Sequence, residues 1–107
     1  MKRFRIEWSP FALKCLNEIH AYISNEAKSE VPANRFVQKL FERVDILATH
    51  PFTGQLEYYF EGSDIEGRYL VEGSYKIIYH VRRDAVEILD VFHTKQNPKK
   101  ITKRAKK

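Results

Sequence analysis

Apolar and polar residues alternate through the C-terminal third of the chain, from Arg68 to His93, with the period of two that is typical of β-strands. Gly73 and Ser74 divide this stretch and provide the glycine-first pair that a two-residue type II′ turn requires. Such a turn would place Leu70 directly opposite Ile77. The stretch therefore predicts three consecutive antiparallel strands, with the register of the first hairpin fixed by its turn.

The second hairpin of this stretch can pair in two registers, and a slip of one residue turns every side chain to the opposite face of the sheet. A two-residue loop would bring Asp90 into an otherwise apolar face, where an unpaired carboxylate is costly to bury. A three-residue loop, 83–85, avoids this. We therefore predict the three-residue loop, with helices covering the apolar face. That face would hold Ile77, Tyr79, Leu89 and Val91, with Tyr79 opposite Leu89 and Ile77 opposite Val91.

The reverse face of the predicted sheet mixes apolar and charged side chains. On one strand, Lys76, His80 and Arg82 are separated by even numbers of residues, so their side chains point the same way. Aromatic and aliphatic residues lie between these cations, which favours a binding surface for nucleic acid or protein over an ordinary solvated face. The whole predicted face comprises Tyr69, Val71, Lys76, Ile78, His80, Arg82, Ile88, Asp90 and Phe92.

The first half of the chain predicts one strand followed by two helices. Residues 4–8 alternate between apolar and charged side chains, as in a strand with one buried face. Ser9 followed by a proline is a strong helix start, and apolar residues continue at helical spacing over 10–27. A second stripe of this kind opens at Pro32 and ends before His50. The short connection between the two allows only an antiparallel helical hairpin.

These elements predict an α+β fold in a single domain, with the order β-α-α-β-β-β and both helices on one face of the sheet. The glycine-punctuated connection 52–67 leaves room for a short extra strand. The first strand is separated from the others by the helices, so we expect it at a sheet edge or beside a distant strand. We assign residues 1–93 to the domain and 94–107 to a basic C-terminal tail.

The chain has a net charge of +5, and its positive charge comes from this tail. Of the 19 lysines and arginines, seven lie in residues 94–107, which hold no acidic residue, so the rest of the chain carries 12 basic against 14 acidic groups. Two interpretations stay open. Lys95, Lys99 and Lys100 could bind phosphates or an acidic protein in a salt-sensitive way, or the tail could be a solvated terminus.

The single cysteine, Cys15, excludes an internal disulfide and suits a reducing compartment. No apolar run is long enough to span a bilayer, and the chain opens with a polar strand pattern rather than with a signal peptide. We therefore expect a soluble cytoplasmic protein without membrane contact.

Few residues form a pattern that indicates catalysis. The sequence has no phosphate-binding glycine loop, no paired-cysteine motif and no serine nucleophile elbow, and its four histidines lack metal-ligand spacing, so we expect neither cofactor nor metal. His93 could act as a general acid or base in phosphodiester cleavage, assisted by Glu57 and by Lys76 or Arg68. In the predicted register Lys76 pairs with Phe92, which turns His93 to the other face and favours a strand-capping role.

Several short sequence motifs occur in the same order as in a known family. They are IEWSPFALKCLNEIHAYI, PANRFVQKL with ILATHPFTG, RYLVEGSYKIIYHV and VEILDVFHTKQNP, and they span about residues 4 to 100. In this order and spacing the chain resembles toxins of the RelE/ParE superfamily, from bacterial type II toxin–antitoxin modules. The resemblance implies a small sheet with an N-terminal helical hairpin. It also implies a cognate antitoxin, whose acidic or amphipathic C-terminal segment wraps and neutralises the toxin in a hetero-oligomer.

The resemblance leaves the target open. One branch of the superfamily cleaves messenger RNA in the ribosomal A site, and there it places Arg68, Lys76 and His93 near catalytic positions. The other branch poisons DNA gyrase and is not known as a nuclease, and the phrasing AYI, PA, HP and G looks more like this branch. Lys76, His80, Arg82 and the tail would then bind the target. A third alternative is a diverged module that binds only antitoxin or operator DNA.

Overall fold

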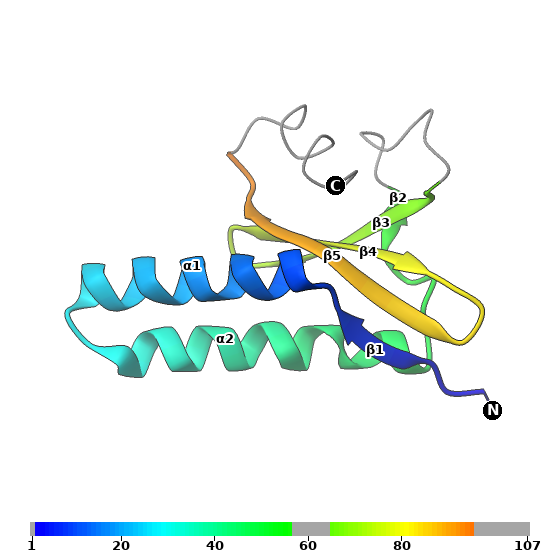
Figure 1. Ribbon diagram of the computed structural model, residues 1–107, viewed down its shortest axis with the longest axis horizontal. Coiled ribbons are helices and arrows are strands. Elements are labelled where there is room, and N and C mark those ends of the chain that lie inside the picture. Colours follow the sequence, from blue (N-terminus) through cyan, green and yellow to red (C-terminus); the bar gives the residue numbers. More distant parts are fainter. Residues whose placement is uncertain (1, 57–64, 96–107) are drawn as a thin grey trace.

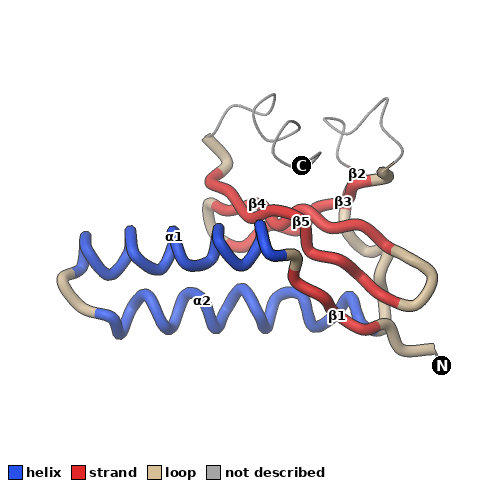
Figure 2. Tube along the Cα trace, viewed as in Figure 1, coloured by secondary structure: helices blue, strands red, loops and turns tan. Residues whose placement is uncertain are grey.

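Two helices pack against one face of a mixed sheet (Figures 1 and 2) in this computed structural model, which describes residues 2–56 and 65–95. The elements are β1 (Arg5–Trp8), α1 (Pro10–Ala27), α2 (Glu30–Val44), the 3-10 helix η1 (Asp45–Ala48), β2 (Gln55–Leu56), β3 (Gly67–Glu72), β4 (Tyr75–Val81) and β5 (Ala85–His93). The strand order across the sheet is β1-β5-β4-β3-β2. The α+β class and the helical hairpin on one face are therefore confirmed.

α1 starts where the sequence predicts. The Ser9 hydroxyl accepts a hydrogen bond from the Ala12 N–H at 3.0 Å, and the proline that follows Ser9 occupies the first helical position. The helix ends at Ala27 because Lys28 adopts a left-handed conformation with a φ of 55°, and the Lys28 N–H donates to the Ser24 carbonyl. Local capping thus defines both ends of this helix.

α2 begins earlier than predicted. Ser29 caps it, because its hydroxyl accepts a hydrogen bond from the Val31 N–H at 3.2 Å, and Glu30 is the first helical residue. Pro32 therefore lies inside the first turn instead of opening the helix. Proline is tolerated there because the N–H that it lacks would have no acceptor within the helix. Neither helix of the described part is long and apolar enough to cross a membrane.

The first hairpin forms in the predicted register. Leu70 pairs with Ile77 across β3 and β4. Gly73 has a φ of +58°, whereas Ser74 is not among the residues with positive φ. This sign pattern is that of a type II′ turn, whose first central position favours glycine. The turn thus sets the pairing of these two strands.

Two short strands form the edges of the sheet. β1 pairs in parallel with β5 and ends with Trp8 opposite Ile88. At the other edge β2 pairs with β3 in the antiparallel sense, so the connection 52–67 does contain a short extra strand. The residues that follow β2, 57–64, lie outside the described part, and Glu57 is among them.

The predicted three-residue loop of the second hairpin is wrong. The Arg82 N–H donates to the Ala85 carbonyl at 2.7 Å, which closes a shorter loop made of Arg83 and Asp84. This two-residue loop corresponds to the alternative register, in which Tyr79 pairs with Ile88. That register holds only for the part of the hairpin next to the loop.

A β-bulge in the middle of β5 combines the two registers. On the loop side, Tyr79 pairs with Ile88 and not with Leu89, whereas on the far side Ile77 pairs with Val91 as predicted. The extra residue bulges between these pairs. Ile88 therefore takes the place predicted for Leu89 on the helix side, and Leu89 moves to the reverse face.

The main core lies between the helices and the sheet, and a smaller cluster lies on the reverse face. From the sheet, the main core takes Leu70, Ile77, Tyr79, Val86, Ile88 and Val91, and from the helical layer Ala12, Cys15, Leu16, Ile19, Leu40, Val44 and Leu47. The reverse cluster consists of Ile78 and Phe92, with Tyr69 and Leu89 packed against them. Apart from the exchange of Ile88 and Leu89, these clusters agree with the predicted faces.

Asp90 is buried, although its charge predicts a position away from the apolar face. It lies at the bulge with 0% of its surface exposed, and the Cys15 thiol donates to its Oδ1 across 3.4 Å. A buried carboxylate is costly only when it lacks a hydrogen-bond donor. The helix supplies one, which offsets part of the cost of burial.

A hydrogen-bonded node joins β3 and β4 to the loop before β2. Tyr79 is fully buried, and its hydroxyl accepts a hydrogen bond from the Gly54 N–H at 2.8 Å. Arg68 Nη1 donates to the Gly54 carbonyl at 2.9 Å and to the Phe52 carbonyl at 3.3 Å. A Cβ on Gly54 would lie 2.5 Å from the Tyr79 hydroxyl oxygen and 2.7 Å from the Tyr69 carbonyl oxygen. The close approach therefore requires glycine.

We expect Gly54→Ala to destabilise the fold by about 1–3 kcal/mol, because the added methyl group must displace the Tyr79 hydroxyl or the Tyr69 backbone. Tyr79→Phe should also lower the free energy of unfolding by about 1–3 kcal/mol, because the Gly54 N–H loses its acceptor. The two changes share one contact, so the double variant should lose less than the sum of the single losses. Urea unfolding of the three variants measures this, and strictly additive losses would contradict it.

Candidate functional site

Lys76 and His80 lie on the reverse face of β4, as predicted, because they alternate with residues of the main core, and Arg82 follows directly after the strand. The Lys76 ammonium lies 4.2 Å from the centroid of the Tyr69 ring, a cation–π contact. His80 Nδ1 lies 3.2 Å from the Glu66 carbonyl oxygen. These side chains are therefore held against the protein and do not extend as one free basic row.

The structure does not bring Arg68, Lys76 and His93 together. Arg68 pairs with Tyr79 and His93 pairs with Tyr75, positions that are about 13 Å apart along a strand. Lys76 points to the opposite face of the sheet. The Arg68 guanidinium is also bound to loop carbonyls in the node described above. In the ranges that the structure describes, no group of three or more metal-ligating side chains could hold a metal ion either.

His93 ends β5 on the helix side of the sheet. Its ring lies edge-on to that of Tyr75, with the centroids 5.3 Å apart, and its Nδ1 accepts a hydrogen bond from the Lys95 N–H at 3.2 Å. This bond satisfies a main-chain donor just beyond the strand, in keeping with the strand-capping role. Lys95 is exposed, whereas Lys99 and Lys100 lie outside the described residues.

An open groove of about 680 Å³ lies between α1 and the ends of β4 and β5. Its apolar lining includes Ile19, Ile23, Phe36 and Val91, and its polar lining includes Glu18, Tyr22, Ser74, Tyr75 and His93. Tyr22 is 62% exposed. Burial, with a smaller effect of the nearby Tyr22, raises the pKa of Tyr75, so the Tyr75 hydroxyl stays neutral at physiological pH. The groove thus offers an apolar lining with several hydrogen-bonding groups.

The sequence pattern does not reveal this groove. Its lining comes from α1, from α2, from the turn between β3 and β4, and from the end of β5, which are far apart in the chain. The available signal was Tyr22, a large aromatic residue in the apolar stripe of α1 that the fold leaves exposed. A helical stripe by itself cannot show which of its members the sheet fails to cover.

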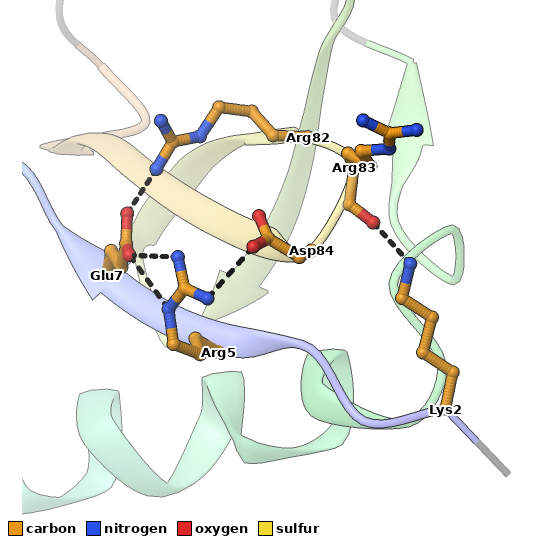
Figure 3. Close-up of polar contacts among 6 residues, drawn as sticks. All are labelled: Lys2, Arg5, Glu7, Arg82, Arg83 and Asp84. Carbon is orange, nitrogen blue, oxygen red and sulfur yellow. Dashed lines mark hydrogen bonds and ion pairs between the residues drawn. The ribbon is translucent and has the colours of Figure 1, made fainter.

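An ion-pair network ties β1 to the β4–β5 hairpin (Figure 3). Arg5 pairs with Glu7 at 3.0 Å and with Asp84 at 3.0 Å, while Arg82 pairs with the other carboxylate oxygen of Glu7. The Arg5 guanidinium holds the pKa of Asp84 below its ordinary value of 3.8, and the two carboxylates raise the pKa of Arg5. The network is solvent-exposed, so it orients the two arginines more than it stabilises the fold.

The sequence also matches a protein-family model over residues 6–98, and that family is described as the ParE toxin of type II toxin-antitoxin system, parDE. This chain belongs to the ParE toxin family. The resemblance to the RelE/ParE superfamily is thereby confirmed, in its ParE branch. As a ParE toxin, the chain is the toxin component of a type II toxin–antitoxin module.

Two similar proteins support this assignment. "Putative toxin Y4kP" of Sinorhizobium fredii (strain NBRC 101917 / NGR234) is 39% identical over 98 residues, which are 90% of this chain and 94% of that protein. A chain from the chromosomal ParDE TA system from P. aeruginosa superposes with a TM-score of 0.68 at 18% identity, over 85% of this chain and 96% of that one. At this identity the second likeness establishes the shared fold.

The ParE fold places the predicted site residues without assigning them roles. Arg68, Lys76 and His93 stay predictions as catalytic groups, and Lys76, His80, Arg82, Lys95, Lys99 and Lys100 stay predictions as target-binding groups. Two other features of this ParE toxin have a geometry that suits binding. They are the groove beside α1 and the ion-pair network beside the β4–β5 loop.

We expect the Asp84–Arg5 contact to make a pH-dependent contribution to stability. The folded-state pKa of Asp84 is lowered, so the contribution is present above the ordinary pKa of 3.8 and is lost as the pH falls through the lowered value. The stability difference between wild type and Asp84→Asn should therefore be largest near neutral pH and shrink in acid. Urea midpoints measured across pH test this. Glu26→Gln, an exposed acid on α1, is the control, and a difference independent of pH would contradict the expectation.

Proposed function

We propose that this ParE toxin inhibits DNA gyrase by binding it, in the bacterial cytoplasm, and that a cognate antitoxin neutralises it. The match to the ParE family over residues 6–98 carries this proposal, because it includes nearly all of the described fold. Gyrase is the target that the resemblance implies for this branch. The mode of action would be binding without chemistry by the toxin itself.

The separation of the candidate catalytic groups supports binding over cleavage. A general acid or base must come within about 2.6–3.2 Å of the proton that it transfers. Arg68 and His93 lie at different positions along the sheet, Lys76 points to the other face, and Arg68 is bound to carbonyl groups. The ribosome-dependent endoribonuclease of the related branch would need these groups around one phosphodiester.

We expect purified toxin to block supercoiling of relaxed plasmid by DNA gyrase, with half-inhibition at similar concentrations for wild type and His93→Ala. Pre-mixing with the antitoxin encoded beside the toxin gene should restore supercoiling. The antitoxin-neutralised sample is the control for contaminating nucleases. Unchanged supercoiling at a large excess of toxin would reject the gyrase target.

The same two toxin proteins should be added to a translating extract. Messenger cleavage by wild type that falls about 10²–10⁴-fold in His93→Ala would establish acid–base catalysis and the endoribonuclease alternative. Intact messenger together with blocked supercoiling is the outcome that we expect.

We further propose that the antitoxin covers the groove between α1 and the end of β5. The apolar lining supports this, because an amphipathic or extended segment could bury its side chains there. Glu18 and His93 provide polar contacts at the same place. Tyr22 is large, exposed and aromatic, and aromatic residues of this kind commonly dominate binding energy at interfaces.

We expect Tyr22→Ala to weaken antitoxin binding about tenfold or more, because truncation of such an aromatic residue typically costs ~1–2 kcal/mol or more. Toxicity without antitoxin should be unchanged. Leu13→Ala is a matched control, since Leu13 is 45% exposed on the same helix but does not line the groove. Calorimetry with the antitoxin measures both affinities, and equal effects of the two substitutions would refute the assignment of the groove.

A further inference from the structure

The β4–β5 loop and the residues up to β1 gather cations at one end of the molecule. Figure 1 shows this end opposite the turn that joins the two helices. The cations, which we call the basic tip, are Lys2, Arg3, Arg5, Arg82 and Arg83, and all five are exposed. The Lys2 ammonium donates to the Arg83 carbonyl oxygen, which holds the N-terminal segment beside the loop (Figure 3).

The acids at this end do not neutralise the basic tip. Glu7 and Asp84 are already bonded to the two arginines of the ion-pair network, and Glu87 lies opposite Glu7 in the sheet. The five cations therefore outnumber these three acids. Within the described part of the chain, the side chains of Arg3 and Arg83 make no hydrogen bond or ion pair, so their donors are available to a ligand. Figure 3 shows the Arg83 guanidinium without a bond to the other residues drawn.

The ion-pair network also prepares Arg5 and Arg82 for a ligand. A guanidinium carries five N–H donors, and the bonds to Glu7 and Asp84 use only some of them. Each of these arginines can therefore donate to a further acceptor while its position stays fixed. Guanidinium groups match the geometry of phosphate oxygens, which they can bind with two parallel hydrogen bonds.

The surface of the basic tip suits phosphate better than protein. Protein interfaces are usually built around buried apolar or aromatic residues, whereas phosphate binding requires only cations and hydrogen-bond donors. None of the large exposed hydrophobic residues of the described part lies before α1 or in the β4–β5 loop. β1 runs beside the β4–β5 hairpin up to its loop, so the cations of both segments form one surface.

We propose that the basic tip binds the phosphate groups of duplex DNA. The proposal goes beyond the inhibition of gyrase and the binding of antitoxin, and it can be tested with neither of them present. Arg3 and Arg83 would supply unpaired guanidinium groups, and Arg5 and Arg82 would supply oriented ones. Contacts of this kind would be independent of DNA sequence and sensitive to salt.

The test measures binding of the full chain to a short fluorescent DNA duplex at several salt concentrations. In the double variant Arg3→Gln/Arg83→Gln, the plot of log K against log salt should become less steep by about 0.9 for each phosphate contact that is lost. At ~0.1 M salt this corresponds to roughly 8-fold weaker binding for each contact. Arg3→Lys/Arg83→Lys keeps both charges and should keep the wild-type slope.

The matched control is Arg35→Gln/Lys39→Gln. It removes the same charge from two exposed residues of α2, and the basic tail is intact in every variant, so the tail contributes equally. Thermal unfolding checks that each variant is folded. Should the double tip variant unfold, Arg83→Gln alone should lower the slope by about 0.9.

A smaller slope in the tip variant than in the control supports the proposal. Equal slopes in the two variants would overturn it, because binding would then follow total charge. A tip variant that keeps DNA binding but loses binding to a poly-glutamate peptide would also overturn it, since the tip would then serve an acidic protein. A tip variant with wild-type binding to both probes would exclude the tip as a binding surface.

Discussion

The β-bulge in β5 is the constraint on which the rest of this structure depends. The short loop of the second hairpin imposes one register on the strand, and the apolar contacts beyond the bulge require another that differs by one residue. Without the bulge, one half of β5 would turn its apolar side chains away from the helices. With it, Ile88 and Val91 both reach the main core, and Leu89 covers the reverse cluster.

The β-bulge in β5 also sets the position of α1. The Ser9 N–H donates to the Ile88 carbonyl at 2.9 Å, so the helix begins directly beside the bulge. Six residues further along the chain, Cys15 reaches the carboxylate of Asp90. A local irregularity in one strand therefore anchors the helical layer, accommodates a buried acid and leaves His93 on the helix side, next to the groove.

The two surfaces that we propose for binding lie at opposite ends of β5. The strand spans nine residues, or about 30 Å, from the basic tip to the groove. The groove is concave and largely apolar, and it suits a segment that can bury side chains. The tip is charged and lacks exposed large hydrophobic residues, and it suits a polyanion. Their separation and their different chemistry allow the toxin to hold two kinds of partner on one rigid sheet.

The sequence by itself determined the features that depend on neighbouring residues. The Ser9 cap and the glycine-first turn at Gly73 rest on interactions over a few positions, and both formed as predicted. The helical stripes also form the helical side of the main core, although Tyr22 of the first stripe stays exposed. The order of the sequence motifs also indicated the RelE/ParE superfamily, and the match to the ParE family model confirmed this resemblance. α2 starts earlier than predicted, because the Ser29 side chain caps the helix before Pro32 is reached.

Only the tertiary structure decided the features that depend on distant residues. The bulge lets one strand satisfy both the register of its loop and the register of its core contacts. The donor to Asp90 comes from 75 residues away, and β1 pairs with β5 from the other end of the chain. The groove likewise exists only where four segments meet. Periodicity shows that a face is apolar, but not which distant atom will lie against it, because that contact is chosen by the packing of the whole chain.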